Sequence, residues 1–356
     1  MKRLDLLLIF LVIGTSLFGL LMIFDASSFI SFRDFGTKYH YSTEQLLWMV
    51  LGFAGLGFFS WFDYKKFYNL SVPLLIGAIG LLVAVFLPGL GIKVLGAHRW
   101  INLHFFVLQP AEFVKLTLAI YLAAWFSSKE KGRFMAFLLL LGLVLGLVLL
   151  EPDMGTAIII LCEAFVLYFL SGGKIAHFLS AIPVLGLGGL LLAVLSPYRA
   201  KRLATFLNPS QDSSNSSYHI KQILIALGSG GWFGVGLGNS LQKYAYLPEN
   251  TTDSIFAIIA EEIGFVGSLV VLFVLAAIVW CGIKISIATT DPFGRLLAGG
   301  ITAFLASQML INLGAQTALM PLTGVPLPFI SYGGSALVVD LCSVGILLNI
   351  ARRGVK

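Results

Sequence analysis

Charged side chains are scarce in this chain. Asp, Glu, Lys and Arg make up 11% of its 356 residues, whereas 58% of the residues are hydrophobic. Soluble globular domains carry about 25% charged residues, so the composition excludes an ordinary soluble domain. The apolar residues form long uninterrupted runs, which exclude a membrane β-barrel, because barrel strands alternate polar and apolar residues. The sequence therefore predicts an all-α integral membrane protein.

Cysteine is also rare. The chain has three cysteines, Cys162, Cys281 and Cys342, and each lies inside an apolar run. They have neither the spacing of zinc ligands nor a CxxC pair, so we interpret them as small buried hydrophobic residues. The 23 basic residues are spread along the chain. This distribution argues against nucleic acid as a partner and fits inner loops that face anionic membrane lipids.

The apolar runs predict about ten membrane-spanning helices in one domain, residues 1–356. More than half of the basic residues flank the runs on the side of the two termini, so the positive-inside rule places both termini in the cytoplasm. The eighth run is long enough to tilt or to project from the bilayer. We expect the spans at residues 5–24, 45–61, 70–87, 109–126, 134–150, 155–170, 175–195, 254–287, 299–318 and 336–351.

A large extracytoplasmic loop, residues 196–253, is expected between the seventh and eighth spans. A loop of this length is rarely without structure in a compact protein. Apolar residues recur at i, i+3, i+4 and i+7 between Ile220 and Leu227, and Gly228 follows as a helix stop. We therefore predict a short amphipathic helix that lies in the outer membrane interface.

Three carboxylates, Asp253, Glu261 and Glu262, stand at the head of the eighth apolar run. An ionised carboxylate in hydrocarbon is costly unless it is paired, hydrated or protonated, so membrane proteins tend to keep such groups where they line a cavity or do chemistry. A helix cap at Thr251 or Thr252, with Asp253 in the first turn, would explain Asp253 alone. It would not explain the two deeper glutamates. We interpret this segment as a candidate site.

Three more outer segments carry unusual polar residues. Arg99 beside Trp100 is either an interfacial anchor or an anion contact. Glu112 and Lys115 are three residues apart on an expected helix, so they form either a structural ion pair or a contact with a polar substrate at the membrane surface. The segment Glu151–Gly155 has two acids around a proline, which fits a tight turn as well as it fits metal or substrate binding.

Two further segments complete the outer polar set. Lys243 and Glu249 alternate with two tyrosines just before the eighth span. The segment Pro321–Ser335 contains three prolines and three glycines and is expected to form a kinked connection between the last two spans. Irregular backbone at membrane depth is tolerated only where it is buried or lines a cavity. Together these segments predict an outward-facing cavity for an amphipathic, anionic ligand from the outer leaflet. A lipid-linked pyrophosphate sugar meets this description, and so do several transported solutes.

Six motifs occur in order along almost the whole chain, and their combination is highly specific. They are GAHRWIN (96–102), QPAEFVK (109–115), EPDMG (151–155), RLATFLNP (202–209), the run 236–265 and PLTGVPLPFISYGGS (321–335). On these motifs the chain resembles the SEDS family (shape, elongation, division and sporulation). Phe113 and the pair Asn102 and Leu103 favour the rod-shape branch over the division branch. Ala318 departs from the family pattern, which has Gly, Thr or Arg there, but the change is conservative.

The resemblance implies a bacterial peptidoglycan glycosyltransferase of the cytoplasmic membrane that serves cell elongation and rod shape. Members of the family polymerise lipid II, an undecaprenyl-pyrophosphoryl disaccharide-peptide, into a growing glycan strand, and they work with a class B penicillin-binding protein, a transpeptidase. The essential acid of the family falls on Asp253, which we take as the catalytic residue. The substrate-binding residues that the resemblance implies are Arg99, Glu112, Lys115, Lys243, Glu249 and Ser331.

The resemblance also implies a chemistry for these residues. A β-linked product from an α-linked donor requires inversion in one displacement and one base, which we assign to Asp253. An alternative role for Asp253 is to hold a divalent cation, Mg²⁺ or Mn²⁺, as a cofactor. Arg99, Lys115 and Lys243 are the expected partners of the leaving pyrophosphate. Two other functions remain open, a lipid II flippase and a scaffold that activates the transpeptidase.

Overall fold

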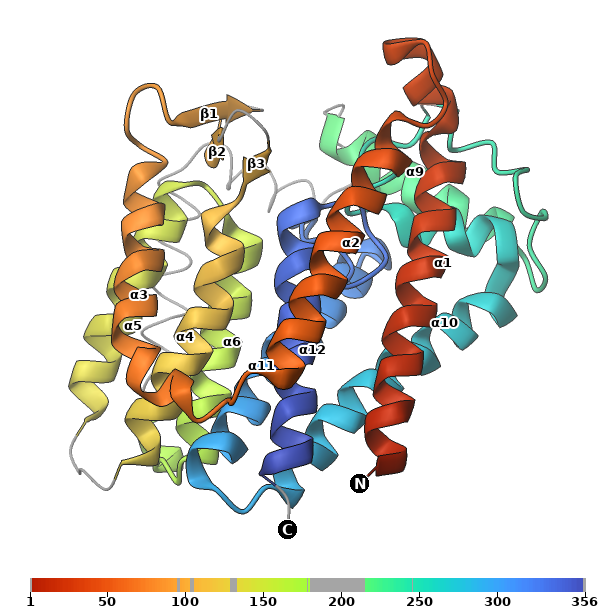
Figure 1. The fold of residues 1–356 in the computed structure, drawn as a ribbon. Coiled ribbons are helices and arrows are strands. Elements are labelled where there is room, and N and C mark those ends of the chain that lie inside the picture. The colour runs from red at the N-terminus through yellow and green to blue at the C-terminus, as the bar shows by residue number, and fades with distance from the viewer. Residues whose placement is uncertain are drawn as a thin grey trace.

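The computed structural model describes residues 2–94, 97–102, 106–128, 133–177, 179, 215–244 and 246–354. In these residues the chain forms a bundle of long helices with a small sheet at one end (Figure 1). The expected seventh span, 175–195, lies almost entirely outside the described residues, as does the loop up to residue 214. The helices are α1 (Lys2–Phe35), α2 (His40–Trp61), α3 (Lys66–Ala84), α4 (Pro110–Ser127), α5 (Phe134–Leu150), α6 (Met154–Leu170), α9 (Asn215–Ser229), α10 (Ile255–Ala288), α11 (Pro292–Gln316) and α12 (Gly334–Arg353).

Every other expected span corresponds to one of these helices, and most ends agree within a few residues. The first span is the exception, because α1 continues to Phe35 instead of ending near residue 24. The prediction stopped where Asp25 interrupts the apolar run. In the folded chain Asp25 accepts a hydrogen bond of 2.8 Å from Lys243, so its charge is paired and the helix continues past it.

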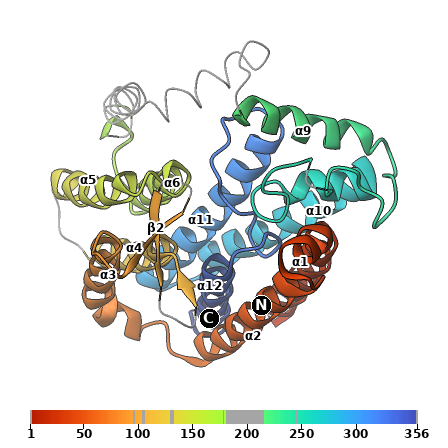
Figure 2. The ribbon, with the colours of Figure 1, turned by 90° about the horizontal axis from the view of Figure 1, so that it is seen from above.

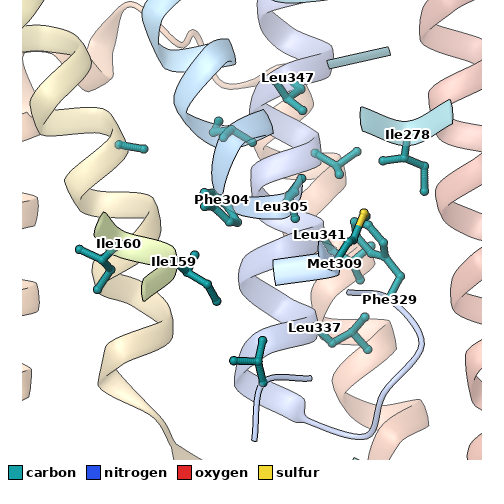
Figure 3. Packing of buried hydrophobic residues seen from close by; sticks show 14 of the residues in the cluster. Ile159, Ile160, Ile278, Phe304, Leu305, Met309, Phe329, Leu337, Leu341 and Leu347 are labelled. Atoms are coloured by element: carbon teal, nitrogen blue, oxygen red, sulfur yellow. The ribbon is translucent and has the colours of Figure 1, made fainter. Parts of the chain in front are cut away.

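The helices α11 and α12 form the centre of the bundle. Their apolar stretches are 78% and 83% buried, whereas those of α1, α3 and α10 are between 28% and 39% buried. Viewed from above, α11 and α12 lie between α1 and α2 on one side and the helices α3 to α6 on the other (Figure 2). Side chains from α6, α10, α11 and α12 gather with Phe329 in one apolar cluster (Figure 3).

The outer helices expose large apolar side chains, among them Phe10, Leu47 and Phe273, which are 69% exposed or more. Five helices in the described residues are long and apolar enough to cross a membrane. An apolar outer surface around a packed interior is what a membrane-embedded bundle requires, because hydrocarbon is its solvent.

The helix α10 is broken at Gly264, although the sequence predicts one continuous span. Gly264 has φ 70° and ψ −172°, a conformation that only glycine adopts readily. The two residues after Gly264 form hydrogen bonds with the loop that precedes α10 in the sequence. The Phe265 amide donates to the Gly231 carbonyl at 2.9 Å, and the Val266 amide donates to the Trp232 carbonyl at 3.1 Å. A side chain at Gly264 would meet the backbone of Gly234. The break is therefore built into the fold and bends α10 around this loop.

A three-stranded antiparallel sheet, which the sequence did not predict, covers part of the bundle end. Its strands are β1 (Gly91–Val94), β2 (Ala97–Asn102) and β3 (Val107–Leu108), in the order β1-β2-β3. The strands are too short to show a period in the sequence. Figure 1 places this sheet and α9 at one end of the bundle and both termini at the other.

The predicted interfacial helix is present as α9, although it begins earlier and ends later than expected. It covers Asn215–Ser229 and so includes Gly228, which was expected to end it. Ile220, Ile223 and Ala226 are buried on one face, while Leu224 and Ile225 are exposed. The helix thus packs against the bundle at the end that carries the sheet (Figure 1).

Candidate functional site

Asp253 lies just before α10 rather than in its first turn. The N-cap of α10 is Ser254, so the expected cap at Thr251 or Thr252 is wrong. Residues 251–254 instead form turns in which the amides of Thr252 and Ser254 both donate to the carbonyl of Glu249, at 3.2 and 3.1 Å. Asp253 is half-buried in these turns, one residue before the N-cap of α10.

Two carboxylates surround one hydroxyl at this position. The Thr252 Oγ1 lies 3.2 Å from Asp253 Oδ1 and 3.0 Å from Glu249 Oε2. The connection between α11 and α12 passes the other side of Asp253, because a Cβ on Gly324 would lie 4.0 Å from Asp253 Oδ2. Gly324 has φ 73°, where a side chain would be strained. The arrangement brings Asp253, Glu249 and the prolyl-glycyl motif together, as the sequence predicts.

The connection that carries this motif, residues 317–333, is irregular, as expected, and its second half is largely buried, whereas Leu319 and Met320 are exposed. Val325, Leu327, Phe329 and Ile330 are at most 3% exposed. Ser331 is 4% exposed, and its Oγ accepts a hydrogen bond of 2.8 Å from the Leu327 amide. Ser331 therefore closes a turn of the connection.

Glu112 and Lys115 form the ion pair that their spacing allows. The Lys115 Nζ lies 2.7 Å from Glu112 Oε2 and donates to Gln308 Oε1 at 2.6 Å. Lys115 is fully buried and Glu112 is 2% exposed. The pair joins α4 to α11 inside the bundle, and Gln308 continues to the connection through a hydrogen bond to the Pro326 carbonyl at 3.1 Å.

Two further acids lie in the bundle interior without hydrogen-bond partners. Glu163 on α6 is fully buried and Asp340 on α12 is 1% exposed, and none of their four carboxyl oxygens has a partner within the described residues. An unpaired buried charge is costly in an apolar interior. The positive charge of Lys115 is already paired with Glu112, so no salt bridge neutralises Glu163 or Asp340 within the described residues.

We expect Glu163→Gln and Asp340→Asn to leave the free energy of unfolding unchanged or to raise it. Each amide has the shape of the acid but carries no charge that the interior must accommodate. Thermal unfolding in detergent measures the effect. Glu112→Gln is the control, because its carboxylate has a partner in Lys115 and its loss should lower the unfolding temperature. A lowered unfolding temperature in Glu163→Gln would show that the carboxylate has a stabilising role.

Arg99 projects from β2 onto the turn after α5. Its Nε donates to the Glu151 carbonyl at 3.0 Å and its Nη2 to the Pro152 carbonyl at 2.6 Å. The same turn is fixed by Asp153, whose side chain accepts hydrogen bonds from the Thr156 amide at 3.0 Å and from Gln109 Nε2 at 3.2 Å. The two acids of this segment were explained either by a tight turn or by metal or substrate binding. Asp153 has a structural role in the turn, because it is the N-cap of α6.

The Glu151 side chain is buried in this turn. Burial, reinforced by the charge of Asp153, raises its pKa to about 8, although Arg99 acts in the opposite direction. The pKa of Glu151 is therefore higher in the folded state than its ordinary value of 4.5. Its contribution to the stability of the fold is fully present below pH 4.5 and is lost as the pH rises through about 8.

The unfolding temperature of the wild type is therefore expected to fall, relative to that of Glu151→Gln, as the pH is raised from about 5 to about 9. Differential scanning fluorimetry in detergent measures this difference. Asp34→Asn is the control, because a hydrogen bond from Arg33 lowers the pKa of Asp34 and keeps it ionised over this range. A constant difference between wild type and Glu151→Gln across the range would contradict the assignment.

Lys243 links three parts of the chain. Its Nζ donates to both carboxyl oxygens of Asp25, at 2.8 and 2.9 Å, and to Glu262 Oε1 at 3.0 Å. Burial alone would lower the pKa of Lys243, but the hydrogen bonds that it donates to Asp25 and Glu262 outweigh burial and raise the pKa. Lys243 is 4% exposed and holds α1 against the start of α10.

The two deeper glutamates of the eighth span do not face the site of Asp253. Glu262 accepts hydrogen bonds from the amides of Gly238 and Ser240, at 3.1 and 3.2 Å, and Glu261 from the Ser240 hydroxyl and the Leu241 amide. The expectation that they mark the same site as Asp253 is therefore wrong. They anchor the glycine-rich loop that inserts at the break of α10, where backbone amides, the Ser240 hydroxyl and Lys243 satisfy their charge.

A row of three amides on α11 was not predicted from the sequence. Gln308, Asn312 and Gln316 recur at i, i+4 and i+8 and are at most 2% exposed. Gln308 contacts Lys115, Asn312 contacts the Asp253 carbonyl, and Gln316 contacts the Ala257 amide. The signal was present as three long polar side chains on one face of an apolar span. This row connects the buried Lys115 to the segment of Asp253.

A search of the described residues finds no group of three or more His, Cys, Asp or Glu side chains that could hold a metal ion. Asp253 and Glu249, which share the hydroxyl of Thr252, offer two carboxylates. Mg²⁺ usually binds through one or two carboxylates together with substrate phosphates and water. The residues present therefore fit a divalent cation that arrives with a phosphorylated ligand.

Comparisons with known proteins agree with this picture. The family model for cell cycle proteins of the FtsW, RodA and SpoVE type matches residues 5–355. The chain is similar to stage V sporulation protein E of Bacillus subtilis (39% identity, covering 98% of this chain and 97% of the relative). It is also similar to the probable peptidoglycan glycosyltransferase FtsW of Geobacter sp. strain M18 (37% identity, 98% and 97% covered).

Two solved structures have the same fold. One, described as showing the structural coordination of polymerization and crosslinking by a peptidoglycan synthase complex, matches with a TM-score of 0.83 at 27% identity, covering 98% of this chain and 97% of that one. The rod shape determining protein RodA of Thermus thermophilus matches with a TM-score of 0.73 at 27% identity and the same coverage. The chain is a multi-pass membrane protein that belongs to the FtsW/RodA/SpoVE family of cell cycle proteins, the SEDS family.

Proposed function

We propose that this protein is a peptidoglycan glycosyltransferase that polymerises lipid II on the outer face of the bacterial cytoplasmic membrane. The observation that supports this proposal most is the site of Asp253. A half-buried carboxylate lies beside the prolyl-glycyl motif and a second acid, Glu249. We place both termini in the cytoplasm, which puts Asp253 on the outer side, where lipid-linked sugars are polymerised.

The proposed step is one inverting displacement. The 4-hydroxyl oxygen of the incoming lipid II attacks the anomeric carbon of the growing strand, its proton passes to the Asp253 carboxylate, and the bond to the lipid pyrophosphate breaks. A positioned general base typically contributes about 10²- to 10⁴-fold to such a step. The half-buried position of Asp253 suits this role, because it leaves the carboxylate accessible while the surrounding backbone restricts its orientation.

The leaving pyrophosphate gains charge as the bond breaks, and cations stabilise it. We propose Arg99, Lys115 and Lys243 for this role, with Glu112 and Ser331 in the same substrate-binding set. In the present structure each cation has partners within the chain, so each would exchange or share a partner when the substrate binds. Lys115 donates to Gln308, which lies four residues before Asn312 on α11, and Asn312 bonds the Asp253 carbonyl.

As the alternative role for Asp253, we propose that it holds a divalent cation, Mg²⁺ or Mn²⁺, together with Glu249. Bound there, the ion would neutralise negative charge on the pyrophosphate. Glu249 is exposed and accepts a hydrogen bond from the Thr252 hydroxyl, so it can also reach a ligand that approaches from the membrane surface.

We propose a class B penicillin-binding protein as the partner, with lipid II and the growing glycan strand as substrates. The solved complex with the same fold couples polymerization and crosslinking, which supports a transpeptidase partner for this chain. We further propose a role in elongation and rod shape. The curated relatives carry division and sporulation names, so the test is depletion in the native cell: rounded cells support the elongation role, and filaments or a sporulation block contradict it.

The experiment that tests the activity uses fluorescent lipid II in detergent micelles, with the purified protein alone and with its transpeptidase partner. Detergent removes the bilayer, so a flippase gives no product in this assay. Polymer that disappears when EDTA is added and returns with Mg²⁺ or Mn²⁺ supports both the activity and the cation. An absence of polymer, together with passage of lipid II across liposome membranes, would instead support a flippase. Stimulated crosslinking without polymerisation would support a scaffold.

A further inference from the structure

The row of amides on α11 contacts the Asp253 carbonyl, the start of α10 and the connection between α11 and α12. Gln308, Asn312 and Gln316 are long polar side chains in the most buried part of the bundle. A buried amide destabilises a fold unless its hydrogen bonds are made. The partners of these amides therefore indicate which parts of the structure they hold in place.

Asn312 joins the segment of Asp253 to the connection between α11 and α12. Its Nδ2 donates to the Asp253 carbonyl at 3.0 Å and to the Val325 carbonyl at 2.7 Å. Its Oδ1 accepts a hydrogen bond of 2.7 Å from Gln316 Nε2, which fixes the orientation of the amide. One side chain thus bonds the backbone of the catalytic acid and the residue next to Gly324, which itself faces the Asp253 carboxylate.

Gln316 supplies the cap that α10 lacks locally. The amide of Ala257, in the first turn of α10, lies 2.8 Å from Gln316 Oε1 and 3.0 Å from the Ser254 carbonyl. A serine at the N-cap normally accepts from such an amide through its side chain. Here the Ser254 Oγ is bonded instead to His219 Nε2 of α9, at 2.7 Å, and makes no cap. The direction in which α10 starts is therefore set by α11.

We propose that Asn312 and Gln316 are positioning residues that hold Asp253 in its reactive orientation. They act through the backbone, at the Asp253 carbonyl and at the Ala257 amide in the first turn of α10, and they do not touch the substrate. The inference rests on the proposed function, because it assumes that Asp253 is the base. A displacement of about 1 Å at a reacting group can cost about 10²-fold in rate, so a small shift of this segment is enough to matter.

The variants Asn312→Ala and Gln316→Met test the inference. We expect kcat for lipid II polymerisation to fall about 10- to 100-fold, with KM unchanged within about threefold, because the variants alter the orientation of the base and leave substrate contacts in place. Gln316→Glu keeps an acceptor for the Ala257 amide and is expected to retain more of kcat than Gln316→Met. A purely structural role would lower the amount of folded protein without this separation of kcat from KM.

Asn349→Ala is the matched control. Asn349 is 1% exposed and also bridges two backbone groups, because its Oδ1 accepts from the Tyr64 amide at 3.0 Å and its Nδ2 donates to the Ser60 carbonyl at 2.9 Å. It lies on α12 far along the helix from Ser335, near the C-terminal end of the chain (Figure 1). We expect Asn349→Ala to lower the unfolding temperature as Asn312→Ala does, and to leave kcat per folded molecule unchanged.

The outcomes separate this inference from the proposed function. If the wild type polymerises lipid II and both Asn312→Ala and Gln316→Met keep the wild-type kcat, the positioning role is wrong and the proposed function stands. If Asn312→Ala does not fold, Gln316→Met alone decides, because it removes the cap and leaves both bonds from Asn312 to the backbone. If the wild type makes no polymer, or if Asp253→Asn polymerises at the wild-type rate, the proposed function fails and the inference fails with it.

Discussion

Asp253→Asn is expected to reduce the rate of lipid II polymerisation by about 10²- to 10⁴-fold. Asparagine has the same shape and can keep the backbone hydrogen bond to Asn312, but it cannot accept the proton of the attacking hydroxyl. The unfolding temperature should therefore stay close to that of the wild type, while kcat falls. Initial rates at saturating lipid II measure the effect.

Two further variants define what the carboxylate does. Asp253→Glu keeps the acid but moves it outward by one methylene, and a misplacement of about 1 Å can cost about 10²-fold, so this variant is also expected to be slow. Asp34→Asn is the matched control, because Asp34 is an exposed aspartate in the last turn of α1 and is paired with Arg33 at 2.7 Å. It should polymerise at the wild-type rate. Full activity in Asp253→Asn would remove the base from the proposed mechanism.

Lys115→Met is expected to lower the free energy of unfolding by about 3–5 kcal/mol, the usual effect of removing one partner from a buried ion pair. Methionine fills a similar volume but leaves Glu112 without its cation and Gln308 without its donor. The same interior also contains Glu163 and Asp340, whose carboxyl oxygens have no hydrogen-bond partner in the described residues. Chemical unfolding in detergent, followed by tryptophan fluorescence, measures the loss.

The double variant Glu112→Gln with Lys115→Met shows whether the charge is the cause. It removes both members of the pair, so we expect it to be more stable than Lys115→Met alone, which gives a coupling energy between the two sites. Lys221→Met on the exposed side of α9 is the control and should change stability by no more than about 0.5 kcal/mol. A loss in Lys221→Met equal to that in Lys115→Met would show that the pair has no special role.

The spans were predictable from the sequence because the length of an apolar run reflects the thickness of the bilayer. The prediction 134–150 coincides with α5, and 336–351 lies within α12. The end of α1 was not predictable in this way. The charge of Asp25 is neutralised by Lys243, which is distant in the sequence, and only the folded chain brings the two together.

The candidate site was predictable in part. The spacing of Glu112 and Lys115 indicates their ion pair, since residues three apart share a helix face. Glu261 and Glu262 show the limit of such reasoning, because three of their hydrogen bonds come from backbone amides of a loop that inserts at Gly264. Almost every residue has a backbone amide, so the sequence does not indicate which amide donates to a given carboxylate.

The central claim is that Asp253 is the base in lipid II polymerisation. The most direct test is the initial rate of polymerisation of labelled lipid II in detergent. Wild type and Asp253→Asn are assayed side by side, each in complex with the transpeptidase partner. The account predicts polymer from the wild type and a rate at least about 10²-fold lower from the equally folded variant. Equal rates from the two proteins, or no polymer from either, would contradict it.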